Sequence, residues 1–416
     1  MIRVLLLAWL SGCTLLAQAD WKTYSPKEMT SMEVHLVSMG PSHDLFTSGG
    51  HTLLRIIDPV AHTDLMYNWG AFSEDEPLFL WSFMRGTSEY HLLVEPMFPA
   101  FQKDIQAYPR NVFQDRITLT VLQKKKLLQL IENWLQHPRY QYHVWSKNCS
   151  TLVAELLNEA TDGGIAAQLE GKKVSVTYRS LWMTYFGSFT ALAVAADFVL
   201  NGKADKPLTG WGLRFTPMLF RQYLHPLFAI DDAGVLSSEH LLTHPVQLYK
   251  HPVPYGVGER GYQAILLFVA LLAFLGMMSK RLCYDKLARA ILCLTQNLWG
   301  IFAFLVSMTV FAITFLSTRE YFQFSAVLWI FWPVDLLFIG RKFSTRWIRL
   351  QNGLVVLHVI SWLGLGLCYG VGFVEQSMLH IGLYLIPASG FVFLLRAYLA
   401  SSDATALGLK SSTSLR

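Results

Sequence analysis

A cysteine in the first half of the chain has the local setting of a nucleophile. The run 146–151 reads Ser-Lys-Asn-Cys-Ser-Thr, and apolar residues at helical spacing follow it over 152–157. With Asn148 as the N-cap, Cys149 becomes the first residue of the helix. The N-terminal end of a helix is electropositive and favours a thiolate over a thiol. The sequence therefore predicts a reactive thiol at position 149.

The distribution of the cysteines supports this prediction. Only Cys149 lies between the apolar N-terminal segment and the first long apolar run of the C-terminal half. The other cysteines are Cys13, Cys283, Cys293 and Cys368. A lone cysteine in an oxidising compartment has no disulfide partner, which is typical of a reactive thiol. A buried, inert thiol is the alternative interpretation.

A thiol nucleophile needs a base that takes its proton and later returns it to the leaving group. His51 stands in the run Ser-Gly-Gly-His-Thr at 48–52. Two glycines let the backbone turn tightly and present the imidazole at the start of a strand. The other histidines of the polar half lack this setting, so His51 is the predicted base.

Short strands and one early helix are predicted to position these two residues. Strand-like runs rich in β-branched and aromatic residues span 33–37, 51–57, 64–69, 89–94 and 112–119. A helix follows from about 121 to 135, with Thr120 and Gln123 as a capping box. The polar half is therefore predicted to be an α+β domain.

Four motifs in this order resemble the N-terminal periplasmic domain of the Lnb family, bacterial membrane transacylases that remodel lipoprotein acyl chains. They are Ser-Gly-Gly-His-Thr at 48–52, Tyr-Asn-Trp-Gly at 67–70, Phe-Met-Arg-Gly at 83–86 and Asn-Cys-Ser-Thr at 148–151. The resemblance covers about residues 30–225 and ends in Arg-Phe-Thr-Pro at 214–217. It implies a circularly permuted papain-like fold, in which a strand histidine serves a cysteine that opens a later helix.

The same resemblance assigns roles to the residues. It implies that Cys149 is the nucleophile, that His51 is the general base and acid, and that Asn68 orients the imidazole. Asn68 also fits a simple turn residue before a glycine, and both interpretations stay open. The amide of Cys149, helped by Asn148 or Tyr142, is expected to form the oxyanion site.

The chain begins like an exported protein. Residues 1–19 contain a basic start, an apolar stretch and Ala-Gln-Ala, which predict a signal peptide cleaved before Asp20. The run Leu-Ser-Gly-Cys ending at Cys13 also fits a lipoprotein signal, and this alternative remains. We expect an extracytoplasmic domain over 20–255, membrane helices over 260–400 and a cytoplasmic tail over 401–416.

The composition demands a membrane-embedded region, because 53% of the residues are hydrophobic and only 15% are charged. Five runs are long enough to cross about 30 Å of hydrocarbon. They span 261–279, 290–316, 322–340, 352–374 and 377–399. We therefore predict a five-helix transmembrane bundle.

Basic residues set the predicted orientation. They gather between the first two runs and between the third and fourth, which the positive-inside rule places in the cytoplasm. The polar domain is then outside, so the chain is expected to be a multi-pass protein of the bacterial inner membrane. Counting the apolar stretch 181–200 as another span would invert this arrangement, so we interpret it as a buried or membrane-touching part of the outer domain.

Polar residues inside the predicted bundle are expected to lie at a similar depth. They are Gln296, Asn297, Asp335 and His358. Hydrogen bonding between helices is the simpler interpretation, and a functional relay is the alternative.

We consider three classes of function. The leading hypothesis is a thiol acyltransferase acting through a Cys149 thioester on esters of membrane lipoproteins or phospholipids. The alternatives are a papain-like cell-wall peptidase or amidase that uses the same residues, and a non-catalytic membrane scaffold. No stripe of basic and aromatic residues suggests nucleic acid, and no ligand spacing suggests a metal or cofactor. The sequence leaves the oligomeric state open.

Overall fold

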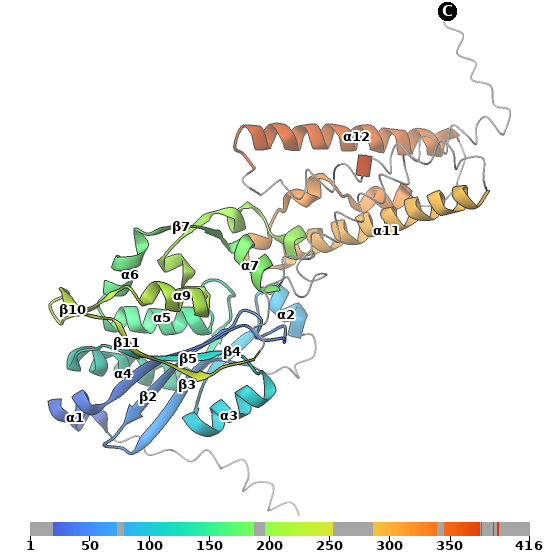
Figure 1. Cartoon of the computed structure of the whole chain (residues 1–416). Coiled ribbons are helices and arrows are strands. Elements are labelled where there is room, and N and C mark those ends of the chain that lie inside the picture. The colour runs from blue at the N-terminus through green and yellow to red at the C-terminus, as the bar shows by residue number, and fades with distance from the viewer. Residues whose placement is uncertain are drawn as a thin grey trace, which may run out of the picture. The chain divides into compact units, whose positions relative to one another are not determined.

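The chain folds into two compact units, which are described separately. A computed structural model describes residues 20–72, 79–186, 196–252, 286–338 and 345–374, with a few single positions beyond (Figure 1). Unit 1 comprises Met1–Phe79, Thr87–Val174 and Leu208–Tyr255, and unit 2 comprises Leu80–Gly86, Ser175–Pro207 and Gly256–Arg416. The chain is thus a mixed α/β protein with an N-terminal sheet domain and later helices.

A seven-stranded antiparallel sheet lies at the centre of unit 1, in the order β11-β5-β1-β2-β3-β4-β6. The strands are β1 (Glu33–Met39), β2 (His51–Asp58), β3 (Thr63–Ala71), β4 (Glu89–Pro96), β5 (Val112–Ile117), β6 (Arg139–Gln141) and β11 (Leu242–Tyr249). All five strands expected before residue 120 are present, and their ends differ from the expected ones by two residues or fewer. Strands β1 to β4 pair in chain order, because short connections favour antiparallel neighbours.

Helices cover the sheet. Those of unit 1 are α1 (Pro26–Ser31), α3 (Met97–Ala107), α4 (Val121–Gln136), α5 (Cys149–Ala160), α6 (Gly164–Glu170) and α9 (Pro217–Leu224). Figure 1 shows α3 and α5 on opposite sides of the sheet. The predicted capping box of α4 is confirmed, since the Gln123 N–H donates to Thr120 Oγ1 and the Thr120 N–H donates to Gln123 Oε1. Two small sheets pair β7 (Lys173–Thr177) with β8 (Pro207–Thr209) and β9 (Phe228–Ile230) with β10 (Leu236–His240).

The core beneath α3 explains the apolar residues of the first strands. Val37, Met39, Leu53 and Met66 pack in one cluster with Met97 of α3. Each is 5% exposed or less, so each contributes about 1.5–3 kcal/mol of burial free energy. This packing fixes the register of β1, β2 and β3, and with it the position of the first residue of β2.

Segments after residue 207 complete unit 1. Strand β11 pairs with β5 at the edge of the sheet. Helix α9 is held by Arg221, whose guanidinium donates to both oxygens of the fully buried Asp115 at 2.5 and 2.8 Å. A buried carboxylate needs such a partner, because an uncompensated charge would cost several kcal/mol, roughly 3–5.

Unit 2 combines two pieces of the polar half with the apolar C-terminal half. Its helices are α2 (Phe79–Arg85, from Leu80 onward), α7 (Tyr178–Phe186), α11 (Lys286–Leu316) and α12 (Thr345–Gly370). Short 3-10 turns are η2 (Gly202–Asp205), η4 (Glu320–Phe322), η5 (Ala326–Trp329) and η6 (Pro333–Phe338). Of the stretch 181–200, the described residues 181–186 and 196–200 group with unit 2.

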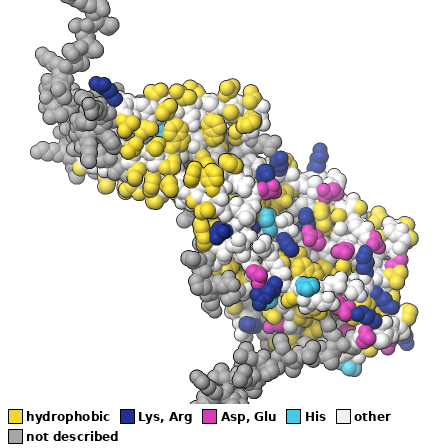
Figure 2. Space-filling view, turned by 180° about the vertical axis from the view of Figure 1, so that it is seen from behind, with side chains coloured by type: hydrophobic (Ala, Val, Ile, Leu, Met, Phe, Trp, Pro, Cys, Tyr) yellow, Lys and Arg dark blue, Asp and Glu magenta, His cyan; other side chains and the backbone are white. Residues whose placement is uncertain are grey.

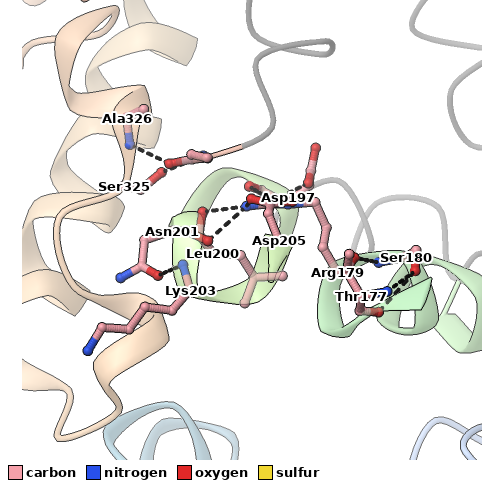
Figure 3. A network of polar contacts seen from close by, with 11 residues as sticks. Thr177, Arg179, Ser180, Asp197, Leu200, Asn201, Lys203, Asp205, Ser325 and Ala326 are labelled. Carbon is pink, nitrogen blue, oxygen red and sulfur yellow. Dashed lines mark hydrogen bonds and ion pairs between the residues drawn. The ribbon is translucent and has the colours of Figure 1, made fainter. Parts of the chain in front are cut away.

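A buried arginine organises the piece of unit 2 around α7. Arg179 donates to the carboxylates of Asp197 and Asp205 at 2.5 and 2.8 Å (Figure 3). Its second terminal nitrogen donates to the backbone carbonyls of Leu200 and Asn201, both at 3.1 Å. Two carboxylates and several carbonyls compensate the burial of one guanidinium, which is the condition under which a buried charge is tolerated.

This piece is bonded to the segment after α11. The Asn201 side-chain amide donates to the carbonyls of Glu320 and Gln323 at 2.7 and 2.6 Å. The Ser325 hydroxyl donates to the carbonyl of Phe198 at 2.6 Å. The connection after α11 is thus fixed by several hydrogen bonds.

The same connection satisfies the C-terminal end of α2. The Thr318 N–H donates to the Arg85 carbonyl at 3.0 Å, and the Ser317 hydroxyl donates to the Met84 carbonyl at 2.8 Å. The last carbonyls of a helix have no partner within the helix, so these bonds complete α2. These bonds therefore join two distant segments of unit 2.

The expected span 322–340 is not one continuous helix, so this part of the prediction is wrong. It contains the separate 3-10 turns η5 and η6. Pro333 opens η6, and proline lacks the N–H that a continuing helix would need. Asp335 accepts the N–H of Trp332 at 2.8 Å, which starts a new turn at this position.

Two helices of unit 2 are long and apolar enough to cross a membrane, over Asn297–Leu316 and Arg349–Gly370. They match the expected spans 290–316 and 352–374. Hydrophobic side chains cover this part of the molecule in Figure 2, and Leu363 is 70% exposed. Such exposure suits lipid contact rather than a soluble core. The expected spans 261–279 and 377–399 lie outside the described residues, apart from single positions of the second.

Two of the polar residues expected inside the bundle do meet. His358 Nε2 and Asp335 Oδ1 lie 2.7 Å apart, and both side chains are buried. The pair joins α12 to η6, as a hydrogen bond between neighbouring membrane segments does.

Candidate active site

The N-terminus of α5 places Cys149 as the sequence predicted. Asn148 is the N-cap, and its Oδ1 accepts the N–H groups of Ser150 and Thr151 at 3.0 and 2.8 Å. Thr151 completes the cap, because its hydroxyl oxygen accepts the Asn148 N–H at 2.6 Å. Cys149 is therefore the first residue of a well-capped helix, at the end where the backbone dipoles favour negative charge.

Glycine shapes the turn that delivers His51 to the start of β2. Gly50 has a φ of +81°, and a Cβ at this position would lie 2.6 Å from the carbonyl oxygen of Met39. Only glycine fits both conditions. A Cβ at Gly49 would have nothing within 4 Å of it, so the second glycine of the motif is the one that the turn requires.

Asn68 lies against the imidazole of His51. Its Oδ1 is 2.9 Å from His51 Nε2 and also accepts the Gly70 N–H at 2.7 Å. An amide oxygen only accepts, so Nε2 carries the hydrogen and Nδ1 is left for the thiol. Asn68 lies within β3, and its bond to the Gly70 N–H two residues on is also of the kind that a turn residue makes.

The thiol and the imidazole form a hydrogen-bonded pair. Burial by itself raises the pKa of Cys149, but the charge of His51, its hydrogen bond and the N–H groups of Thr52 and Ser150 outweigh burial, so the pKa is lowered. Burial by itself lowers the pKa of His51, and the attraction and hydrogen bond of Cys149 outweigh it, so that pKa is raised. Both shifts favour a thiolate beside an imidazolium.

The sheet opens where this pair sits. The pairing of β2 with β3 runs from Asp58 back to Leu54, which lies opposite Tyr67. It stops three residues short of His51, the first residue of β2. The N–H of Thr52 donates to the Cys149 sulfur at this opening. By residue, Cys149 and His51 are both partly exposed.

The expected oxyanion site needs one correction. The Asn148 side-chain amide donates to the carbonyls of Val144 and Phe215, at 2.9 and 3.0 Å, so it is engaged in positioning α5 and does not serve as an oxyanion donor. The Cys149 N–H is at the first helical position, where no acceptor exists within the helix. The prediction that this N–H is a backbone donor to a developing oxyanion stays a prediction. Tyr142 stacks on Tyr90 at a centroid distance of 4.1 Å, and its expected role stays untested.

Several residues that support the site were not found from the sequence. Gly70 packs against the His51 ring, because a Cβ there would lie 2.3 Å from His51 Cε1. Phe215 supplies a carbonyl to the cap of α5 from a distant segment. Only the Tyr-Asn-Trp-Gly and Arg-Phe-Thr-Pro motifs pointed to these positions, without indicating how they act.

Comparison with known proteins identifies the N-terminal part of the chain. Residues 17–183 match the model of the family described as the Lnb N-terminal periplasmic domain, which confirms the resemblance seen in the motifs. This segment is therefore an Lnb-type periplasmic domain, and the two helices that are long and apolar enough to cross a membrane suggest a membrane protein with such a domain. No curated protein and no solved structure matches the chain significantly. Among the described residues, no group of three or more His, Cys, Asp or Glu is arranged to hold a metal ion.

The thiolate–imidazolium pair predicts an unusual pH dependence for thiol alkylation. An ordinary cysteine ionises near pH 8.5, so a lowered pKa lets iodoacetamide modify Cys149 at pH values below this range. In His51→Ala the positive charge that stabilises the thiolate is lost while burial of Cys149 remains. The pH midpoint of Cys149 alkylation should therefore move to higher pH. Mass spectrometry of the Cys149 peptide measures the rate, with Cys368 as internal reference. Equal midpoints in both proteins would contradict the pairing.

Proposed function

We propose that the protein is a cysteine-dependent acyltransferase acting on ester-linked acyl chains of membrane lipoproteins or phospholipids. The observation that carries this proposal is the hydrogen-bonded arrangement of Cys149, His51 and Asn68 in a periplasmic domain of the same chain as apolar helices. A substrate confined to the same bilayer gains effective concentration near the tethered domain.

The residues suit a two-step transfer. The Cys149 thiolate attacks the ester carbonyl, the carbon–oxygen bond breaks, and the His51 imidazolium gives its proton to the departing alkoxide. An amine or hydroxyl then attacks the thioester while His51 takes its proton, and the Cys149 thiolate leaves. Asn68 holds the imidazole in one tautomer throughout, and the N–H of Cys149 stabilises each tetrahedral oxyanion.

We also propose that the N-terminal domain has a circularly permuted papain-like fold. It would lie on the periplasmic face of the bacterial inner membrane, anchored by a multi-pass C-terminal region. The positive-inside rule supports the orientation, because α11 begins at Lys286, among the basic residues expected in the cytoplasm.

The test is incubation of the purified full chain, in phospholipid vesicles, with a diacylated lipoprotein and separately with peptidoglycan peptides. We expect mass spectrometry to detect loss of one ester-linked acyl chain from the lipoprotein and its gain by an acceptor such as the N-terminal amine. Cys149→Ala, prepared identically, is the matched control. Unchanged lipids together with cleaved wall peptides would overturn the proposal in favour of a papain-like peptidase or amidase.

A further inference from the structure

Strand β3 is irregular where it carries Asn68. From Asn68 to Ala71 the strand advances three residues, while its partner β4 advances only two, from Leu93 to His91. One extra residue in one strand is a β-bulge, which turns side chains away from the regular alternation. This bulge directs Asn68 and Gly70 toward His51.

A bulge also removes backbone groups from the regular ladder, and a buried carbonyl then needs another donor. The carbonyl of Trp69, within this bulge, accepts the hydroxyl of Tyr140. Tyr140 belongs to β6, and β4 lies between β6 and β3 in the sheet, so the bond reaches across one strand. Both side chains are buried, at 5% exposure for Tyr140 and 0% for Trp69.

The ring of Tyr140 is held firmly. Trp134 contacts it edge-on at a centroid distance of 5.8 Å, and Tyr90 lies opposite it in the strand pairing of β4 and β6. The ammonium of Lys147, two residues before Cys149, lies 5.6 Å from the ring centroid. A hydroxyl on such a fixed ring is a preorganised donor, and its loss leaves a buried carbonyl without compensation.

We propose that Tyr140 is a positioning residue of the thiol centre, which acts by holding the β3 bulge so that the Asn68 amide oxygen stays aligned with His51 Nε2. The order of contacts is Tyr140 hydroxyl to Trp69 carbonyl, then Asn68 to His51, then His51 to Cys149. In this role Tyr140 acts through Trp69 and Asn68. The inference rests on the proposed thiol chemistry.

The test compares Tyr140→Phe with Tyr24→Phe, each of which removes one buried phenolic hydroxyl. Tyr24 donates to Asp58 at 2.8 Å, and Asp58 ends the same strand that His51 begins, so this control loses a comparable bond far from the centre. The readout is the pH midpoint of Cys149 alkylation in the full chain. If the bulge loosens, Asn68 stabilises the His51 imidazolium less well, and the Cys149 thiolate loses part of its partner charge. Tyr140→Phe should therefore shift the alkylation midpoint to higher pH, while Tyr24→Phe should not.

A double-mutant cycle separates positioning from general loosening. If Tyr140 acts through Asn68, then Tyr140→Phe should slow alkylation at neutral pH by about 10-fold in the wild-type background and leave it unchanged in Asn68→Ala. Equal effects in both backgrounds, or an equal shift in Tyr24→Phe, would overturn the inference. The readout needs no substrate, so it also separates two failures. An ordinary thiol midpoint in the unmodified chain contradicts the proposed chemistry, whereas a low midpoint unaffected by Tyr140→Phe contradicts only the role of Tyr140.

Discussion

Replacing Cys149 by alanine is expected to abolish acyl transfer, with a loss of about 10⁴-fold or more in kcat. In the proposed mechanism the Cys149 sulfur forms the thioester, and alanine offers no nucleophile in its place. Alanine also preserves the helix, because the cap is made by Asn148 and Thr151 rather than by the thiol. His51→Ala should cause a loss of similar size, since the two residues act as one unit. The measurement is single-turnover transfer from a diacylated lipoprotein, followed by mass spectrometry.

A second free cysteine, Cys368, provides the matched control. Cys368 lies in α12, so Cys368→Ala removes a thiol without touching α5. This variant should retain full transfer, and Cys149→Ala should show an unchanged thermal unfolding midpoint. Full turnover by Cys149→Ala would show that another group is the nucleophile.

The sequence predicted the centre of the site because its signals are local. The N-cap of α5 depends on residues three apart, and the five strands before residue 120 follow from alternating apolar residues and turn signals. The pairing of Cys149 with His51 could be predicted for a different reason. A cysteine and a histidine each stand at the first residue of an element that the sequence indicates. The family match over 17–183 confirms the resemblance that joined them.

The parts that escaped prediction depend on contacts far apart in sequence. Phe215 reaches the cap of α5, and Tyr140 reaches the bulge of β3 across another strand. Nothing in the residue types near either position indicates these bonds. The described residues 181–186 and 196–200 show the same limit, because their composition indicates burial but not that they group with unit 2.

The span predicted over 322–340 failed for a local reason. Its apolar content satisfies the length rule, but a proline at 333 and hydrogen-bonding side chains at 325 and 335 break it into short turns. Apolar composition predicts burial in lipid better than it predicts a continuous helix, since backbone bonds in a membrane protein are also satisfied by neighbouring segments.

Gly70→Ala is expected to lower transfer by about 10²-fold or more, chiefly by displacing the imidazole of His51. A Cβ at Gly70 would lie 2.3 Å from His51 Cε1 and 3.2 Å from both His51 Nε2 and Asn68 Oδ1. No real carbon approaches a ring carbon so closely, so the imidazole must move away from its place between Asn68 and Cys149. Because the φ of Gly70 is not positive, alanine introduces no backbone strain there, and the effect falls chiefly on the ring.

Gly49→Ala and Gly50→Ala form a matched pair of controls for this prediction. Gly49 has open space around its Cβ position, so alanine there should leave transfer and alkylation unchanged. Gly50 combines a φ of +81° with a 2.6 Å approach to the Met39 carbonyl, so alanine should lower both the unfolding midpoint and the activity. Gly70→Ala should differ from both, with a nearly native unfolding midpoint but a Cys149 alkylation midpoint moved to higher pH. Native alkylation and transfer in Gly70→Ala would mean that the imidazole does not act from the position against Gly70.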